Sequence, residues 1–140
     1  MSNDSVRPRF LLQNAVLAAR LSKKIETGFT VHGISFNEYV IMEYLAARPE
    51  RGVPRIELAE YMGMSASGVT RLVLPMEKNR VVERETNSRD ARQSLVKLTS
   101  TGRRVFAEAR DSFEQIALEL TRNVSSKELA AVIDAYRTLM

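Results

Sequence analysis

The sequence predicts a mainly helical domain that carries a single β-hairpin. Apolar residues recur at helical spacing along most of the 140 residues, which indicates amphipathic helices. Only two short segments, 81–85 and 94–98, have the composition of strands. The polar, basic stretch RETNSRDARQSLVKLT, residues 84–99, joins them. The predicted order is therefore four helices, a strand, a polar loop, a strand and two helices.

The composition excludes several classes of protein. The chain has no cysteine, so it has no disulfide, thiol switch or Cys-based metal site, and its single histidine, His32, cannot form a His-rich metal site. A hydrophobic fraction of 44% is sufficient for a folded core. No apolar run is long enough to span a membrane, and the first residues lack a signal-peptide pattern. We therefore expect a cytoplasmic protein without metal, cofactor or membrane contact.

The first two helices are predicted from apolar stripes and punctuating residues. Residues 1–6 are expected to be frayed, and Pro8 suits the first turn of a helix that runs towards a break bracketed by Gly28 and Gly33. Ser35 and Glu38 form a capping box that begins the second helix, which stops before Pro49.

Residues 55–74 have the spacing of a helix-turn-helix. Ala59 is small enough for two helices to pass closely, Gly63 permits a left-handed turn, and Ser65 caps the second helix. The predicted buried residues of the pair are Ile56, Leu58, Val69 and Leu72. The exposed side then carries Ser65, Ser67, Thr70 and Arg71, which are able to bind base edges or phosphates. A helical hairpin with ordinary packing is the alternative for these residues taken alone.

The strand–loop–strand that follows favours a winged helix-turn-helix. The wing would carry Arg84, Asn87, Ser88, Arg89, Asp90, Arg92 and Gln93. An arginine at a loop tip fits the negative potential of the minor groove. Asp90 cannot favour phosphate, so we expect it to brace a neighbouring arginine through a charge-assisted hydrogen bond.

The charge distribution supports a polyanionic partner for the middle of the chain. Residues 65–104 contain nine Lys+Arg and four Asp+Glu, a net +5, whereas the other hundred residues contain twelve and thirteen, a net −1. Concentrated positive charge of this kind is typical of nucleic-acid-binding surfaces. An ordinary solvated face is the alternative.

The terminal helices predict dimerisation. Thr99 or Ser100 caps a long helix, and a break at residues 123–125 precedes a last helix. Their broad apolar faces exceed what one protomer can cover, which favours a homodimer formed by residues 1–34 and 100–140 around a winged helix-turn-helix of residues 35–99. A two-fold axis would place two recognition helices about 34 Å apart and predicts a palindromic operator. The alternative is that these helices simply cap the winged domain.

The sequence resembles the MarR family of winged helix-turn-helix transcriptional regulators. The likeness rests on Leu-Ala at 58–59, S-x-S-x-V-T-R at 65–71, E-K at 77–78, D-x-R at 90–92 and L-T-x-x-G at 98–102. The resemblance implies a homodimer that binds palindromic operators, usually represses, and can be released by small ligands, often aromatic acids. Arg92 matches the family's wing-tip arginine, and Ser67, Thr70 and Arg71 match its recognition-helix face. The predicted DNA-binding residues are Ser65, Ser67, Thr70, Arg71, Lys78, Arg84, Arg89 and Arg92.

Three positions depart from the family pattern. Gly68 removes one possible base contact and costs about 1 kcal/mol in a helix interior relative to alanine. Pro75 lacks an N–H for the carbonyl of Arg71, which predicts a kink near Leu74. Arg80 replaces a usual glycine, so we expect Asn79 to adopt the left-handed cap instead.

Other functions have weaker support. His32, between the first two helices, could line a pocket for a small aromatic or anionic effector, and Arg20 could receive its carboxylate; a solvated surface is the alternative for both. No catalytic set or phosphate loop is visible, so an enzyme is not expected. The competing hypothesis is a winged-helix module that binds protein rather than DNA.

Overall fold

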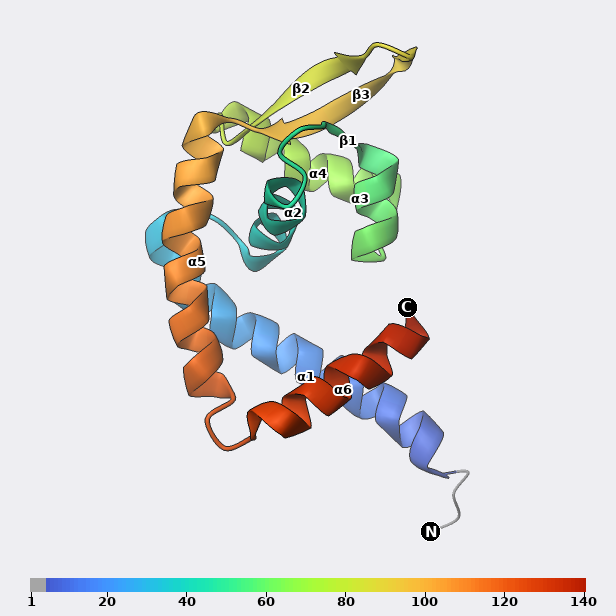
Figure 1. Cartoon of the computed structure of the whole chain (residues 1–140), viewed down its shortest axis with the longest axis vertical. Coiled ribbons are helices and arrows are strands. Elements are labelled where there is room, and N and C mark those ends of the chain that lie inside the picture. The colour runs from blue at the N-terminus through green and yellow to red at the C-terminus, as the bar shows by residue number, and fades with distance from the viewer. Residues whose placement is uncertain (1–4) are drawn as a thin grey trace.

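The computed structural model describes residues 5–140 and confirms the predicted fold class (Figure 1). The expected fraying of residues 1–6 falls mostly on residues 1–4, outside the described part, and residue 6 is already helical. In chain order the elements are α1 (Val6–Phe29), the 3-10 turn η2 (Thr30–His32), α2 (Phe36–Ala46), β1 (Val53–Pro54), α3 (Arg55–Met62), α4 (Ala66–Lys78), β2 (Val82–Asn87), β3 (Asp90–Leu98), α5 (Ser100–Leu120) and α6 (Ser126–Leu139).

A small antiparallel sheet with the order β1-β3-β2 covers one side of the helices. Val53 pairs with Val96, and Val82 pairs with Leu98. The strand β1 was not predicted, because two residues carry no alternation from which to recognise a strand. The two predicted strands extend further towards the tip than expected and leave only residues 88–89 as the turn.

The core lies between this sheet and the helices α1 to α5. Its fully buried large side chains are Phe29, Ile41, Met42, Leu58, Met76, Val53, Val69, Val73, Val82 and Val96. One predicted core residue is wrong, because Ile56 is 62% exposed. Residues two apart on a helix point about 200° apart, so the face that buries Leu58 turns Ile56 to solvent.

The break expected at Gly28 begins later. Helix α1 continues through Gly28 to Phe29, and Gly33 alone adopts the left-handed conformation, with φ of 69°, that ends the turn η2. A Cβ at Gly28 would lie 2.3 Å from Cδ1 of Ile116 in α5. The glycine therefore serves a close helix crossing rather than a turn.

The end of α4 also differs from the expectation. Asn79 has an ordinary φ of −82°, and Arg80 itself takes the left-handed position with φ of 60°. The main chain forms a Schellman motif in which Val81 N–H donates to Met76 at 3.0 Å and Arg80 N–H donates to Glu77 at 2.9 Å. These two bonds require the left-handed residue one position later than predicted. Helix α4 continues through Pro75 to Lys78, and the kink near Leu74 stays a prediction.

The terminal helices leave a large apolar surface open. Helix α6 folds back across α1 at the end of the molecule opposite the hairpin (Figure 1), where Tyr136 Oη donates to Asn14 Oδ1 at 2.7 Å. No residue of α6 is buried. The exposed large apolar residues of these helices include Phe10, Leu11, Leu12, Val16, Leu17, Val132, Ile133 and Leu139. Within residues 5–140, no helix combines the length and apolarity that crossing a membrane requires.

Replacing Arg80 with glycine should stabilise the fold. The left-handed conformation costs an L-residue about 1–2 kcal/mol, and glycine's greater chain entropy offsets part of the gain, which leaves about 0.5–1 kcal/mol. Urea unfolding of Arg80→Gly and of the control Arg80→Ala, which keeps a Cβ, measures this difference. Equal stability of the two variants would contradict the assignment of strain to Arg80.

Candidate nucleic-acid interface

A tight turn presents α4 as the exposed helix of the α3–α4 pair. Gly63 has φ of 64°, and its N–H and that of Met64 donate to carbonyls of the last turn of α3, which confirms the predicted left-handed turn. Ala59 is buried as predicted, at the face of α3 that packs on the core. On α4 the buried residues are Val69, Val73 and Met76, so the opposite face of the helix is open.

The side chains at the start of α4 divide into those used by the fold and those left free. Ser65 Oγ accepts from Gly68 N–H at 3.1 Å, which caps the helix, and also lies 3.1 Å from Ser67 Oγ. Thr70 Oγ1 donates to the carbonyl of Ala66 at 3.1 Å and is half-buried. Ser67 and Arg71 are exposed, so these two residues are the best placed to reach a ligand.

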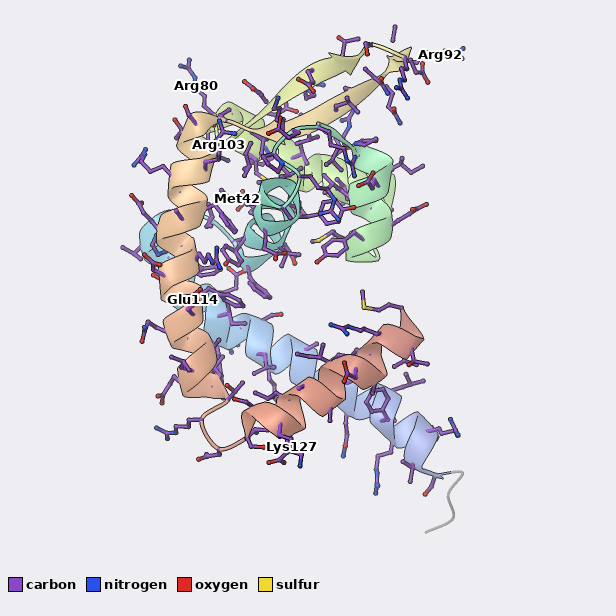
Figure 2. The ribbon with its side chains drawn as sticks, viewed as in Figure 1. Met42, Arg80, Arg92, Arg103, Glu114 and Lys127 are labelled. Carbon is purple, nitrogen blue, oxygen red and sulfur yellow. The ribbon has the colours of Figure 1, made fainter. Side chains whose placement is uncertain are left out.

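The hairpin forms a long projecting wing whose tip carries Arg92 (Figure 2). Strand pairing is regular from Val82–Leu98 to Thr86–Ser94 and then shifts to Asn87–Asp90. Residues 91–93 therefore have no partner on β2 and form a bulge, a feature that redirects side chains. The side chain of Arg92 is 98% exposed. Arg89 is also exposed, in the turn at the tip.

Asp90 shapes this tip through the main chain. Its Oδ1 accepts a hydrogen bond from Arg92 N–H at 3.1 Å, whereas the Arg92 Nε lies 4.0 Å away. On the other side of the turn, Asn87 Oδ1 accepts from Arg89 N–H at 3.0 Å, and Asn87 Nδ2 donates to Gln93 at 2.6 Å. The bracing that we predicted for Asp90 is thus directed at the backbone of Arg92 and leaves the guanidinium free.

Two predicted DNA-binding residues lie apart from this tip. Arg84 is at the base of the wing, where its Nε lies 2.9 Å from Glu77 Oε1 of α4. Lys78 is exposed in the last turn of α4, at the opposite end from Ser67 and Arg71. The structure brings together Ser65, Ser67, Thr70 and Arg71 on one helix end and Arg89 and Arg92 on the wing tip, but not Arg84 and Lys78.

A polar network that the sequence did not indicate holds α3 in place. Arg51 Nη2 donates to Glu57 Oε2 at 2.7 Å, and Tyr44 Oη donates to the same oxygen. The bond from Arg51 lowers the pKa of Glu57, and the bond to Glu57 raises the pKa of Tyr44. The guanidinium of Arg48 stacks 3.5 Å from the centre of the Tyr44 ring. The start of α3 is thereby fixed to the end of α2.

A cavity of about 580 Å³ lies between α2 and α5. Burial raises the pKa of Tyr39 in its wall. The lining residues are Phe36, Tyr39, Val40, Glu43, Ala46, Ala47, Tyr61, Phe106, Arg110, Phe113 and Glu114. Neither residue proposed for an effector site is among them: His32 bonds to Ser112 at 2.7 Å, and Arg20 lines a shallow hollow on α1. Their predicted role draws no support from this cavity.

Comparison with known proteins assigns this winged helix-turn-helix. Residues 32–93 match the model of the MarR family. The winged helix-turn-helix belongs to that family. Membership makes the chain a DNA-binding transcriptional regulator and not an enzyme. No curated protein sequence matches the chain.

Solved structures of MarR-type regulators share the fold over almost the whole chain. The transcriptional regulator BldR from Sulfolobus solfataricus superimposes with a TM-score of 0.89 at 20% identity, and covers 100% of both chains. MarR from E. coli in complex with operator DNA gives 0.82 at 19% identity over 98% of this chain and 96% of that one. CouR from Rhodococcus jostii RHA1, bound to p-coumaroyl-CoA, gives 0.81 at 19% identity over 93% and 88%.

Proposed function

We propose that this MarR-family protein is a homodimeric repressor that binds a palindromic operator and responds to a small aromatic, anionic effector. The observation that carries the proposal is the pairing of an open α4 N-terminus with a fully exposed arginine on a bulged wing tip. A helix at this position reads the major groove, and an arginine at a loop tip suits the minor groove. The E. coli MarR structure with operator DNA supports this assignment by its shared fold.

Each proposed DNA contact has a distinct role. Ser67 and Arg71 would reach base edges or phosphates from α4, with Ser65 capping the helix beneath them. Arg89 and Arg92 would occupy the neighbouring minor groove. Thr70 would act mainly through its packing, because its hydroxyl hydrogen is committed to Ala66.

The open apolar faces of α1 and α6 support the homodimer. Residues such as Leu12, Val16 and Leu17 lie on one exposed stretch of α1, beside a shallow hollow. Contiguous exposed apolar surface of this kind marks a protein interface. Because a second copy offers the same surface, a two-fold pairing buries both at once.

The α2–α5 cavity supports effector binding. Its aromatic walls suit a planar ring, and Arg110, which lies 3.3 Å from Glu114 in α5, offers a cation for a carboxylate. Helix α2 belongs to the winged region and α5 to the dimerisation region, so an occupant would change how the two regions sit relative to each other. The structure of CouR with p-coumaroyl-CoA supports an aromatic effector.

Neutralising the wing should weaken DNA binding and its salt dependence. For Arg92→Gln, the slope of log K against log salt should fall by about 0.9 if one phosphate contact is lost. For Arg71→Gln, loss of a bidentate base contact should cost about 1–3 kcal/mol of discrimination. The measurement is a gel-shift series at several salt concentrations on the promoter region of the protein's own gene. Arg122→Gln on α5 is the control. Wild-type protein that ignores duplex DNA at low salt would favour a protein-binding module instead.

Disrupting the α1 surface should give a monomer. Leu17→Glu places a charge in the proposed interface, so the mass measured by light scattering should fall from twice 15.8 kDa to 15.8 kDa. Leu74→Glu, at a position of similar exposure on α4, should remain dimeric (50% against 52%). A monomeric wild type, or equal masses for the two variants, would refute this interface.

An aromatic acid should bind the α2–α5 cavity. With p-coumarate as the probe, calorimetry should detect binding that Arg110→Gln weakens about tenfold, because a charged hydrogen bond contributes about 1.5–3 kcal/mol. Arg104→Gln, which interrupts an equivalent ion pair with Glu108, should leave the affinity unchanged. Equal affinities of both variants would exclude Arg110 from the site.

A further inference from the structure

Arg55 joins the two elements that form the proposed DNA-binding surface. It is the first residue of α3, and its half-buried side chain extends to both the recognition helix and the wing. Its Nη1 lies 3.5 Å from Thr70 Oγ1 of α4, and its Nη2 lies 3.3 Å from Ser94 Oγ of β3. The guanidinium therefore lies between α4 and the strand that leads to the wing tip.

The charge of Arg55 has no counter-charge in the described structure. None of the ion pairs formed within residues 5–140 includes it, and the acid nearest in the chain, Glu57, is paired with Arg51. Two neutral hydroxyls satisfy at most two of its five N–H groups. A half-buried cation without a carboxylate loses hydration that nothing in the chain replaces.

The position of Arg55 is also unfavourable for its own helix. A cation in the first turn opposes the positive end of the helix dipole. Local departures of this kind concentrate at functional sites, where another interaction offsets them. An anion bound at the guanidinium would supply that interaction for both the charge and the dipole.

The two hydroxyls differ in what they can do. Thr70 donates its hydrogen to Ala66, so it can only accept from Arg55 and hold the guanidinium in place. Ser94 accepts from Arg55, which leaves its own hydrogen available to an oxygen of a ligand. Arg55 and Ser94 together thus offer several donors and no acceptor of negative charge.

We propose that Arg55 and Ser94, positioned by Thr70, bind one phosphodiester of the DNA backbone. The inference rests on the proposed DNA-binding function, in which α4 occupies a major groove and the wing the adjacent minor groove. The sugar-phosphate strand that separates the two grooves passes between these elements, where the guanidinium lies. A guanidinium binds the two free oxygens of a phosphodiester bidentately.

The test is fluorescence anisotropy of the operator duplex over a series of salt concentrations. Arg55→Gln should weaken binding about tenfold at low salt and lower the slope of log K against log salt by about 0.9. It should weaken a mutated operator by the same factor, because a backbone contact carries no sequence information. Arg55→Lys should retain the wild-type slope and recover part of the affinity, and Arg122→Gln serves as the matched control.

Stability separates this role from a merely structural one. Because the charge is uncompensated in the free protein, Arg55→Gln should leave the urea midpoint unchanged or raise it. If Arg55→Gln nevertheless fails to fold, that result contradicts the proposal, and Ser94→Ala then tests the site independently through a several-fold loss of affinity. An unchanged salt slope for Arg55→Gln, while the wild type binds DNA, overturns the phosphate site alone. A wild type that binds no duplex overturns the proposed function as well.

Discussion

The arrangement of the molecule depends on one close contact, between Gly102 at the start of α5 and the main chain of Val81. A Cβ at position 102 would lie 1.9 Å from the Val81 carbonyl oxygen, so only glycine allows the two segments to approach this closely. The contact is secured by Thr99, whose Oγ1 donates to the Arg80 carbonyl at 2.6 Å and accepts from Gly102 N–H at 2.9 Å. Its N–H also donates to Val81 at 3.1 Å.

This junction connects the recognition helix, the wing and the long helix α5 within a few residues. The strained Arg80 ends α4, Val81 leads into β2, and Thr99 leaves β3 and caps α5. The direction in which α5 departs is therefore determined relative to the DNA-binding surface (Figure 1). An effector in the α2–α5 cavity would act on this same helix, which is the physical basis for linking ligand occupancy to the spacing of two recognition helices.

The positive charge of the central region is organised by its pairing. Arg84 is paired with Glu77 and stiffens the base of the wing, whereas Arg92 at the tip has its carboxylate neighbour bonded to the main chain instead. Arg55 is held by hydroxyls alone. Cations near the fold's joints are neutralised, and those near the proposed groove-facing surface are left available to phosphate.

The sequence by itself determined those features that depend on neighbouring residues in the chain. The caps at Ser35 and Ser65, the left-handed turn at Gly63, the order of the helices and the presence of a basic wing all follow from local spacing, and the structure has them. Local hydrogen bonds set each of these features, so a single sequence contains the information.

Only the tertiary structure decided which residues meet across the chain. The two-residue strand β1, the exposure of Ile56, the left-handed Arg80 and the bridge from Arg55 to Thr70 and Ser94 depend on segments up to 39 residues apart. The α2–α5 cavity likewise forms from helices separated by the entire winged region, which is why its lining excludes His32 and Arg20. Such contacts depend on the packing of whole elements against each other, and the periodicity of one helix carries no record of its neighbour's position.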